Sequence, residues 1–355
     1  MAPPTQNTVD DYTVGILCAI DFEKNAVRYM LDEEHQRLPT QPGDSNSYTL
    51  GKLQGHNVVL ACLPSQQGKG AAATVATNMS RSFPSIKWRL FVGIGGGVPS
   101  DQHDIRLGDV VVSMPEGEYG GVVQYDLGRE TNSGFELKGF LWPIPTLLRN
   151  AAQDMKSDHI GRGNQIGKYM AEMFKKWPDM APYQQPSEPD LLFPANIQHP
   201  EGVPACADVC DPSQTTPRSD RHFNGPKIHY GLIASGDLVI KNAARRDEIA
   251  AQFERGVLCF EMEAAGLATE YPSIVIRGIS DYADSHKNKK WQCYAAATAA
   301  ACAKELLTYV DTEAAATEPA PTPRFGAPAR GSTVFIGKGQ QNTGNVNITG
   351  DVNIS

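Results

Sequence analysis

Four acidic residues follow the ends of predicted strands in this sequence. Asp281 comes directly after the apolar run 274–279, and Glu23 lies just past the first apolar run. Glu261 and Glu263 stand at a strand-to-helix junction. Strand carboxyl ends in an open α/β sheet meet at one edge, where ligands bind. Each acid alone is more simply a solvated loop residue or a helix N-terminal charge. Together they favour a site that delivers a proton and stabilises a cationic transition state.

Strands and helices alternate along the first 310 residues. Short apolar runs predict strands at 12–20, 48–53, 57–63, 90–94, 109–114, 231–234 and 273–279. Apolar spacing or Ala-rich composition predicts helices at 21–32, 70–83, 237–254, 262–270 and 292–309. This alternation predicts a three-layer α/β/α fold with a central mixed sheet.

The composition excludes several classes of protein. The 355 residues carry a net charge of −8, with 41% apolar and 20% charged residues, as soluble globular proteins do. The mild acidity disfavours nucleic-acid binding and attachment to anionic membranes. The sequence has no apolar run of about 18 residues and no basic, apolar leader, so we expect neither a membrane span nor a signal peptide. Seven cysteines in such a length indicate a reducing, cytoplasmic location.

Two regions depart from the alternating pattern. Residues 178–226 are Pro-rich with little periodicity, which predicts a long irregular insertion that acts as a lid or an interface. Residues 311–331 form an Ala/Pro linker, and 332–355 form a Gly/Asn-rich tail. We therefore expect a catalytic domain over 11–310, followed by the linker and the tail.

Six motifs carry a family resemblance. In chain order they are VGILCAIDFE, GIGGGVP, LGDVVVS, LIASGDLVI, FEMEAAGLA and VIRGISDYAD. With them the chain resembles the nucleoside phosphorylase/nucleosidase superfamily, especially methylthioadenosine/S-adenosylhomocysteine nucleosidases. Two longer segments, HYGLIASGD and RGISDYADSHKNKKWQCYAAATAAACAKELL, are similar to the fungal form associated with NOD-like receptor and ankyrin proteins. The resemblance implies a nucleoside phosphorylase-type fold, cleavage of a purine N-ribosidic bond, a homo-oligomer, and no cofactor.

The resemblance also implies roles for individual residues. Asp281 would protonate the purine, oriented by Ser280, and Glu263 would hold the ribose hydroxyls above Met262. Phe260 would stack on the base, although an ordinary core aromatic is an equal alternative. The full expected substrate-binding set is Phe260, Glu261, Met262, Ser235, Gly236, Asp237, Val239, Ser280, Ile94, Gly95 and Gly96. Backbone groups of 235–239 would contact the purine edge, while Asp237 could alternatively be a helix N-cap.

Two positions favour hydrolysis over phosphorolysis. Glu23 aligns with the water-activating glutamate of nucleosidases, and a carboxylate there would repel phosphate. Ile94 stands where relatives commonly have a Ser or Thr hydroxyl. Phosphorolysis, an immune-type effector that depurinates adenine nucleotides, and a non-catalytic nucleoside sensor that signals through the tail remain alternatives.

Several cationic groups could meet a 5′-phosphate. Arg277 lies in the strand before Asp281, and Lys241, Arg245 and Arg246 lie just beyond the SGD segment. A solvated helix face is the simpler interpretation of Lys241 to Arg246. The insertion could also cover the 5′ side; its candidates there are His199, Asp211, Arg218 and Arg221.

A metal site is a weaker hypothesis. Cys206 and Cys210, flanked by His199 and His222, have a spacing within the zinc range, but no second cysteine pair follows. A structural role in the insertion, or none, is favoured, and we expect no metal. The glycines of GIGGGVP do not match a dinucleotide-binding fingerprint and predict a tight turn near the ligand.

The tail supports a second kind of function. Low charge, Asn/Gln/Gly content and the alternating Val346, Ile348, Val352 and Ile354 favour stacked, in-register strands. The tail resembles short amyloid-forming motifs of fungal NOD-like receptor systems, which implies a receptor bearing a matching motif as partner. A disordered C-terminus is the alternative.

Overall fold

A computed structural model describes residues 7–312, apart from 66, 133, 204, 205, 207, 208, 222–224 and 255, together with the backbone of 334–336 and 340–342. The chain divides into two units, Met1–Ala320 and Pro321–Ser355. No helix among these described residues is long and apolar enough to cross a bilayer.

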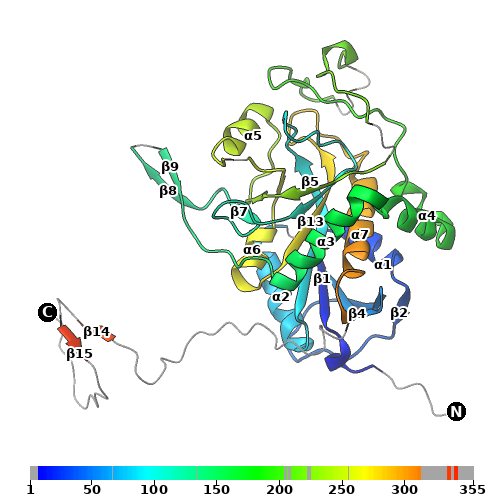
Figure 1. The fold of residues 1–355 in the computed structure, drawn as a ribbon, viewed down its shortest axis with the longest axis vertical. Coiled ribbons are helices and arrows are strands. Elements are labelled where there is room, and N and C mark those ends of the chain that lie inside the picture. The colour runs from blue at the N-terminus through cyan, green and yellow to red at the C-terminus, as the bar shows by residue number, and fades with distance from the viewer. Residues whose placement is uncertain are drawn as a thin grey trace. The chain divides into compact units, whose positions relative to one another are not determined.

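An eleven-stranded mixed sheet forms the centre of the first unit (Figure 1). Its main path runs β10-β6-β13-β5-β1-β4-β3-β2, and β7-β11-β12 branch from β5. The strands are β1 (Val14–Cys18), β2 (Glu33–His35), β3 (Tyr48–Leu53), β4 (His56–Cys62), β5 (Trp88–Gly97), β6 (Val110–Ser113), β7 (Val122–Gln124), β10 (Ile228–Gly231), β11 (Ile233–Ser235), β12 (Cys259–Glu261) and β13 (Ile274–Asp281). β1, β4, β5 and β13 are parallel, whereas β12 meets the end of β5 antiparallel.

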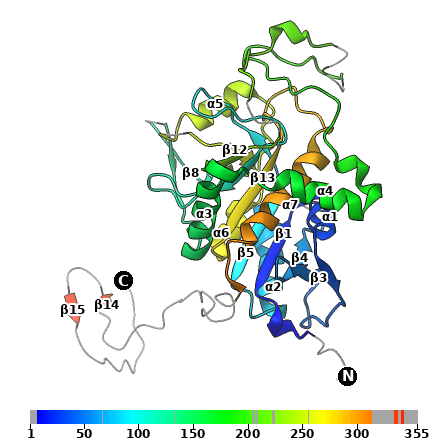
Figure 2. The same cartoon turned by 45° about the vertical axis from the view of Figure 1, so that its right-hand side comes forward.

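Helices cover both faces of this sheet, as Figures 1 and 2 show. On one face pack α1 (Asp21–Tyr29), α3 (Thr146–Arg162), α4 (Ile166–Lys176) and α7 (Gln292–Leu307). On the other pack α2 (Lys69–Ser82) and α6 (Ala264–Glu270), while α5 (Ala243–Ala250) packs on the β7-β11-β12 branch. Successive residues of a strand point to opposite faces, so Ile16 joins the first cluster and Leu17 the second. The predicted three-layer fold is confirmed.

The structure corrects two predictions about local elements. A helix was predicted at 237–254, but the observed helix α5 spans only Ala243–Ala250. It begins after Asn242, whose side chain caps α5 by accepting a hydrogen bond from Arg245 N. The predicted glycine turn after residue 94 is instead part of β5. There β12 and β13 lie so close that a side chain would not fit: a Cβ on Gly95 would come 2.9 Å from Phe260 O, and one on Gly96 2.8 Å from Asp281 Oδ1.

Several elements were not predicted. They include α3, α4, β2, β7, β10 and the hairpin of β8 (Gly128–Thr131) and β9 (Gly134–Leu137). The described part of 178–226 contains two short 3-10 helices, η2 (Pro178–Tyr183) and η4 (Pro212–Gln214). In the second unit, β14 (Val334–Ile336) pairs antiparallel with β15 (Gln340–Asn342). The alternating residues predicted to stack, 346–354, lie outside the described residues.

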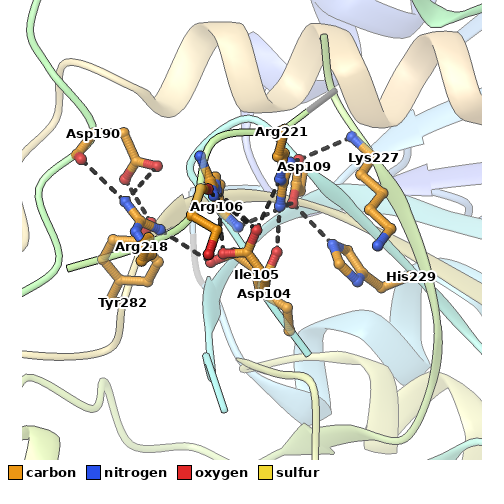
Figure 3. Close-up of polar contacts among 11 residues, drawn as sticks. Asp104, Ile105, Arg106, Asp109, Asp190, Arg218, Arg221, Lys227, His229 and Tyr282 are labelled. Atoms are coloured by element: carbon orange, nitrogen blue, oxygen red, sulfur yellow. Dashed lines mark hydrogen bonds and ion pairs between the residues drawn. The ribbon is translucent and has the colours of Figure 1, made fainter. Parts of the chain in front are cut away.

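Two arginines of the 178–226 insertion fasten it to the domain (Figure 3). Arg221 binds Asp109 through both carboxylate oxygens at 2.7 Å and also contacts Asp104. Arg218 lies 2.8 Å from Asp190 Oδ2 and donates to Tyr282 Oη at 2.8 Å. Asp109 is almost fully buried; burial opposes ionisation, but hydrogen bonds from Arg221 and His229 outweigh it and lower the pKa of Asp109.

We expect Arg221→Met to lower the free energy of unfolding by about 3–5 kcal/mol, because it leaves Asp109 buried with one partner fewer. Urea unfolding at pH 7 measures this loss. The matched control is Arg129→Met: Arg129 and Glu136 form an exposed pair on the β8–β9 hairpin, which should contribute about 0–1 kcal/mol. Equal losses in both variants would show that the Arg221 contacts do not fasten the insertion.

Candidate active site

A cleft of about 360 Å³ opens where β1, β5, β12 and β13 end. Ala19, Ile20 and Glu23 come from the β1–α1 junction, and Ile94 to Gly96 come from β5. Each remaining stretch of the lining follows or precedes a strand of the same edge. These stretches supply Gln67, Leu238, Val239, Ile240, Lys241, Phe260, Glu261, Met262, Glu263, Ser280, Asp281, Ala283, Lys287 and Gln292. The acids that follow separate predicted strands therefore line one cavity.

Three of the expected substrate-binding residues lie outside the described lining. The Ser235 hydroxyl is fully buried and accepts a hydrogen bond from Ala265 N at 2.9 Å. Gly236 N donates to Glu261 O at 3.2 Å. Asp237 binds Lys69, with Nζ 3.1 Å from Oδ2, and it does not cap α5, whose cap is Asn242. Their expected roles stay predictions.

Asp281 is held by three donors at the end of β13. The Ser280 hydroxyl donates to Oδ2 at 2.7 Å, and Ala283 N donates to Oδ1 at 3.0 Å. Lys287 Nζ lies 3.1 Å from Oδ2. Asp281 is 4% exposed, and Gly96 supplies the space beside it. These contacts fix the direction of its carboxyl group.

Glu23 lies in the first turn of α1, directly above the end of β1. Its Oε2 accepts hydrogen bonds from Ala19 N at 2.8 Å and Ile20 N at 3.2 Å. Its Oε1 accepts from Ile94 N at 2.8 Å. Burial raises the pKa of Glu23, and the charge of Arg277 together with these three backbone bonds opposes the rise. The result is a rigid carboxyl group of increased basicity at the wall of the cleft.

Arg277 compensates the buried carboxylates from behind the cleft. Its Nη2 lies 2.6 Å from Glu261 Oε2 and 3.8 Å from Glu263 Oε2, and its guanidinium stacks on Phe91 at 4.1 Å. Burial and the charge of Glu261 raise the pKa of Glu263 to about 8, against the effect of Arg277. Arg277 is wholly buried and is not among the described residues that line the cleft.

Among the other cations expected near a 5′-phosphate, only Lys241 lines the described cleft. Arg245 pairs with Glu248 on the surface of α5. Arg246 is buried and donates to Tyr282 O at 2.9 Å. The residues of the insertion that could have met the 5′ side contact other groups instead. Arg218 and Arg221 form the ion pairs described above. Asp211 accepts a hydrogen bond from Ser213 N, and His199 lies beside two cysteines.

Three polar lining residues were not singled out from the sequence, namely Gln67, Lys287 and Gln292. Lys287 follows Asp281 by six residues, and this short separation was the available signal for it. Gln292 is the first residue of α7. The sequence gives a weaker signal that Arg277 compensates buried carboxylates: it is the one charged residue within the apolar run 274–279.

Comparisons with known proteins agree with this architecture. A family model described as the phosphorylase superfamily matches residues 13–310. A nucleotide-binding leucine-rich repeat (NLR)-like protein of Hyaloscypha variabilis is 42% identical over 330 residues, covering 93% of this chain and 32% of that protein. The chain thus spans about a third of that relative. The 5′-methylthioadenosine/S-adenosylhomocysteine nucleosidase of Mycobacterium bovis is 25% identical, covering 83% of this chain and 95% of that protein.

Solved structures share the fold. The 5′-methylthioadenosine/S-adenosylhomocysteine nucleosidase of Neisseria meningitidis, in complex with methylthio-immucillin-A, is similar with a TM-score of 0.53 and 21% identity. The match covers 83% of this chain and 98% of that one. The futalosine hydrolase of Helicobacter pylori is similar with a TM-score of 0.53 and 18% identity, covering 84% and 97% of the two chains.

We expect Glu263→Gln to stabilise the unliganded protein more at pH 8.5 than at pH 6. The ordinary pKa of Glu is near 4.5, whereas that of Glu263 is about 8. Between these values the folded state keeps a proton that the unfolded state has lost, so this group lowers stability as pH rises. Thermal unfolding at both pH values, with exposed Glu172→Gln as control, measures the difference. An equal effect of Glu263→Gln at both pH values would contradict the raised pKa.

Proposed function

This chain belongs to the phosphorylase superfamily, and we propose that it hydrolyses the N-ribosidic bond of a purine nucleoside to the free base and ribose. One observation carries the choice of hydrolysis: the Ile94 amide, in the glycine-rich segment, donates to the Glu23 carboxylate. An entering phosphate would find that donor occupied and would face Glu23 and Glu261. Anions repel one another strongly where water is excluded, whereas neutral water meets no such barrier.

The proposed mechanism uses the two ends of the cleft. Asp281 in its acid form gives a proton to the purine as the bond to the sugar breaks, and Ser280 holds the carboxyl in position. Glu263 accepts hydrogen bonds from the ribose hydroxyls, and Phe260 and Met262 pack around base and sugar. Glu23 takes a proton from the attacking water, whose oxygen bonds to C1′. The negative charge nearby stabilises the cationic sugar.

Lys287 lies beside the proposed acid, with its Nζ 3.1 Å from Asp281 Oδ2. The names of the relatives support the reaction class, because both nucleosidases and the futalosine hydrolase are hydrolases by name.

A nucleotide substrate is a second candidate, favoured by Lys241. This residue lines the cleft and forms no ion pair with the other described residues, so it could meet a 5′-phosphate. Depurination of adenine nucleotides by an immune-type effector would fit the similarity to an NLR-like protein. Comparing the rates with adenosine and with its 5′-phosphates in wild type and Lys241→Met decides between the two candidates.

We expect Asp281→Asn to lower kcat by about 10²–10⁴-fold, because an amide cannot supply the proton. Binding of a substrate analogue should persist, since Asn keeps the shape of the side chain. Steady-state kinetics and calorimetric titration measure the two quantities. The control is Asp154→Asn on the exposed face of α3, which should keep wild-type kinetics. Full activity in the Asp281 variant would remove Asp281 from the acid role, and an inactive wild type that still binds nucleosides would favour a sensor.

Turnover should not depend on inorganic phosphate. Incubation with adenosine, guanosine, inosine and methylthioadenosine, with and without phosphate, should release free ribose or its 5′-substituted form in both conditions; uridine serves as the negative control. The sugar product is identified by chromatography. Ribose 1-phosphate that forms only when phosphate is present would establish phosphorolysis instead.

A further inference from the structure

Two cysteines and two histidines meet where the insertion contacts the loop after β13. The candidate ligand atoms of His199, Cys206 and Cys210 all lie within 4.8 Å of one another. His286 adds its Nδ1 at 3.6 Å from Cys206 Sγ and 3.5 Å from Cys210 Sγ. Cys210 N donates to Cys206 O at 2.8 Å, so the two cysteines lie close together.

The sulfur–nitrogen distances agree with those around a zinc ion. Zinc binds thiolates at about 2.3 Å and imidazoles at about 2.0–2.1 Å in a tetrahedron, which places sulfur and nitrogen about 3.5 Å apart. His286 Nδ1 already has this separation from both sulfurs. The candidate atoms of His199, Cys206 and Cys210 lie within 4.8 Å of one another, so metal binding would draw these three residues closer together.

The second nitrogen of each imidazole faces a backbone carbonyl. His286 Nε2 lies 3.1 Å from Ile197 O, and His199 Nδ1 lies 2.8 Å from Pro200 O. A ring nitrogen that donates to a carbonyl leaves the other one free of its proton and ready to bind metal, the usual arrangement of zinc-bound histidines. His286 also stacks on Phe193, with ring centroids 4.0 Å apart, and is nearly buried. These contacts orient both rings toward the thiols.

We propose that His199, Cys206, Cys210 and His286 form a four-coordinate zinc site. Four protein ligands leave no open position, which is typical of a structural rather than a catalytic site. The proposal replaces our expectation of no metal. Spacing alone could not find the site, because His286 follows Cys210 by 76 residues. His222, the flanking histidine named from the sequence, lies outside the described residues.

The site would connect the insertion to the proposed acid. His286 immediately precedes Lys287, whose Nζ is 3.1 Å from Asp281 Oδ2. Asp284, buried beside them, accepts a hydrogen bond from His286 N at 3.0 Å. A metal that fixes His286 would therefore also fix the backbone that positions Lys287. This inference does not depend on the proposed reaction, since metal content is measured without substrate.

The test is the zinc content of the full-length chain, purified under reducing conditions without chelators. We expect about one zinc per chain by mass spectrometry of the metal, and below about 0.1 in Cys206→Ser and in His286→Ala. The matched control is Cys293→Ser, a partly exposed cysteine of α7, which should keep its zinc. Zinc that persists in both ligand variants would overturn the proposal.

A second measurement covers the case in which a ligand variant does not fold. Wild-type protein is stripped with a chelator and given Co²⁺, and thiolate-to-cobalt charge-transfer bands with tetrahedral visible bands are expected. Removing the metal should also lower the midpoint temperature of thermal unfolding by several degrees, and adding Zn²⁺ should restore that midpoint. Wild-type protein that takes up neither metal, or that carries a Cys206–Cys210 disulfide after reducing purification, would overturn the proposal.

Discussion

The acidic cleft depends on the ion pairing of the buried Arg277 guanidinium with the glutamates around it. Glu23, Glu261 and Glu263 are each at most 6% exposed, and ionised carboxylates buried together without a cation would strongly oppose folding. Arg277 binds Glu261 most closely and reaches toward the other two. Its Nε and Nη1 have no hydrogen-bond partner among the described residues, so its contribution to the other two carboxylates acts through charge at a distance.

The strands next to Arg277 are adapted to it. A Cβ on Gly93 would collide with the Arg277 guanidinium and would come 2.5 Å from Glu23 Oε1. Glycine at this point of β5 is therefore required by the arginine and the glutamate together. Glu261 serves mainly this support, since its oxygens accept from Arg277, Glu263 N and Ala264 N. The raised pKa values belong instead to Glu263 and Glu23.

The sequence was sufficient for the fold class and for the convergence of the acids, since both follow from alternating apolar runs and from where parallel strands end. It was insufficient where tertiary contacts decide. The glycines after Ile94 form strand rather than turn because β12 and β13 pack against them. Arg277 was one of several cations that could meet a 5′-phosphate, but its neighbours on the inside of the sheet are carboxylates. The contacts that hold the insertion join residues 64, 76 and 112 positions apart, beyond the range of any local pattern.

The insertion contacts the segment after Asp281 at several points. The hydroxyl of the next residue, Tyr282, accepts a hydrogen bond from Arg218, and its carbonyl accepts one from Arg246 of α5. His286, five residues after Asp281, contacts the thiols of Cys206 and Cys210 in the insertion. Between these anchors Ala283 adopts a left-handed φ of 52° that aims its amide at Asp281. Such a conformation is costly for a residue with a Cβ and persists only where its surroundings enforce it. The insertion is therefore part of what orients the proposed acid, although none of its described residues lines the cleft.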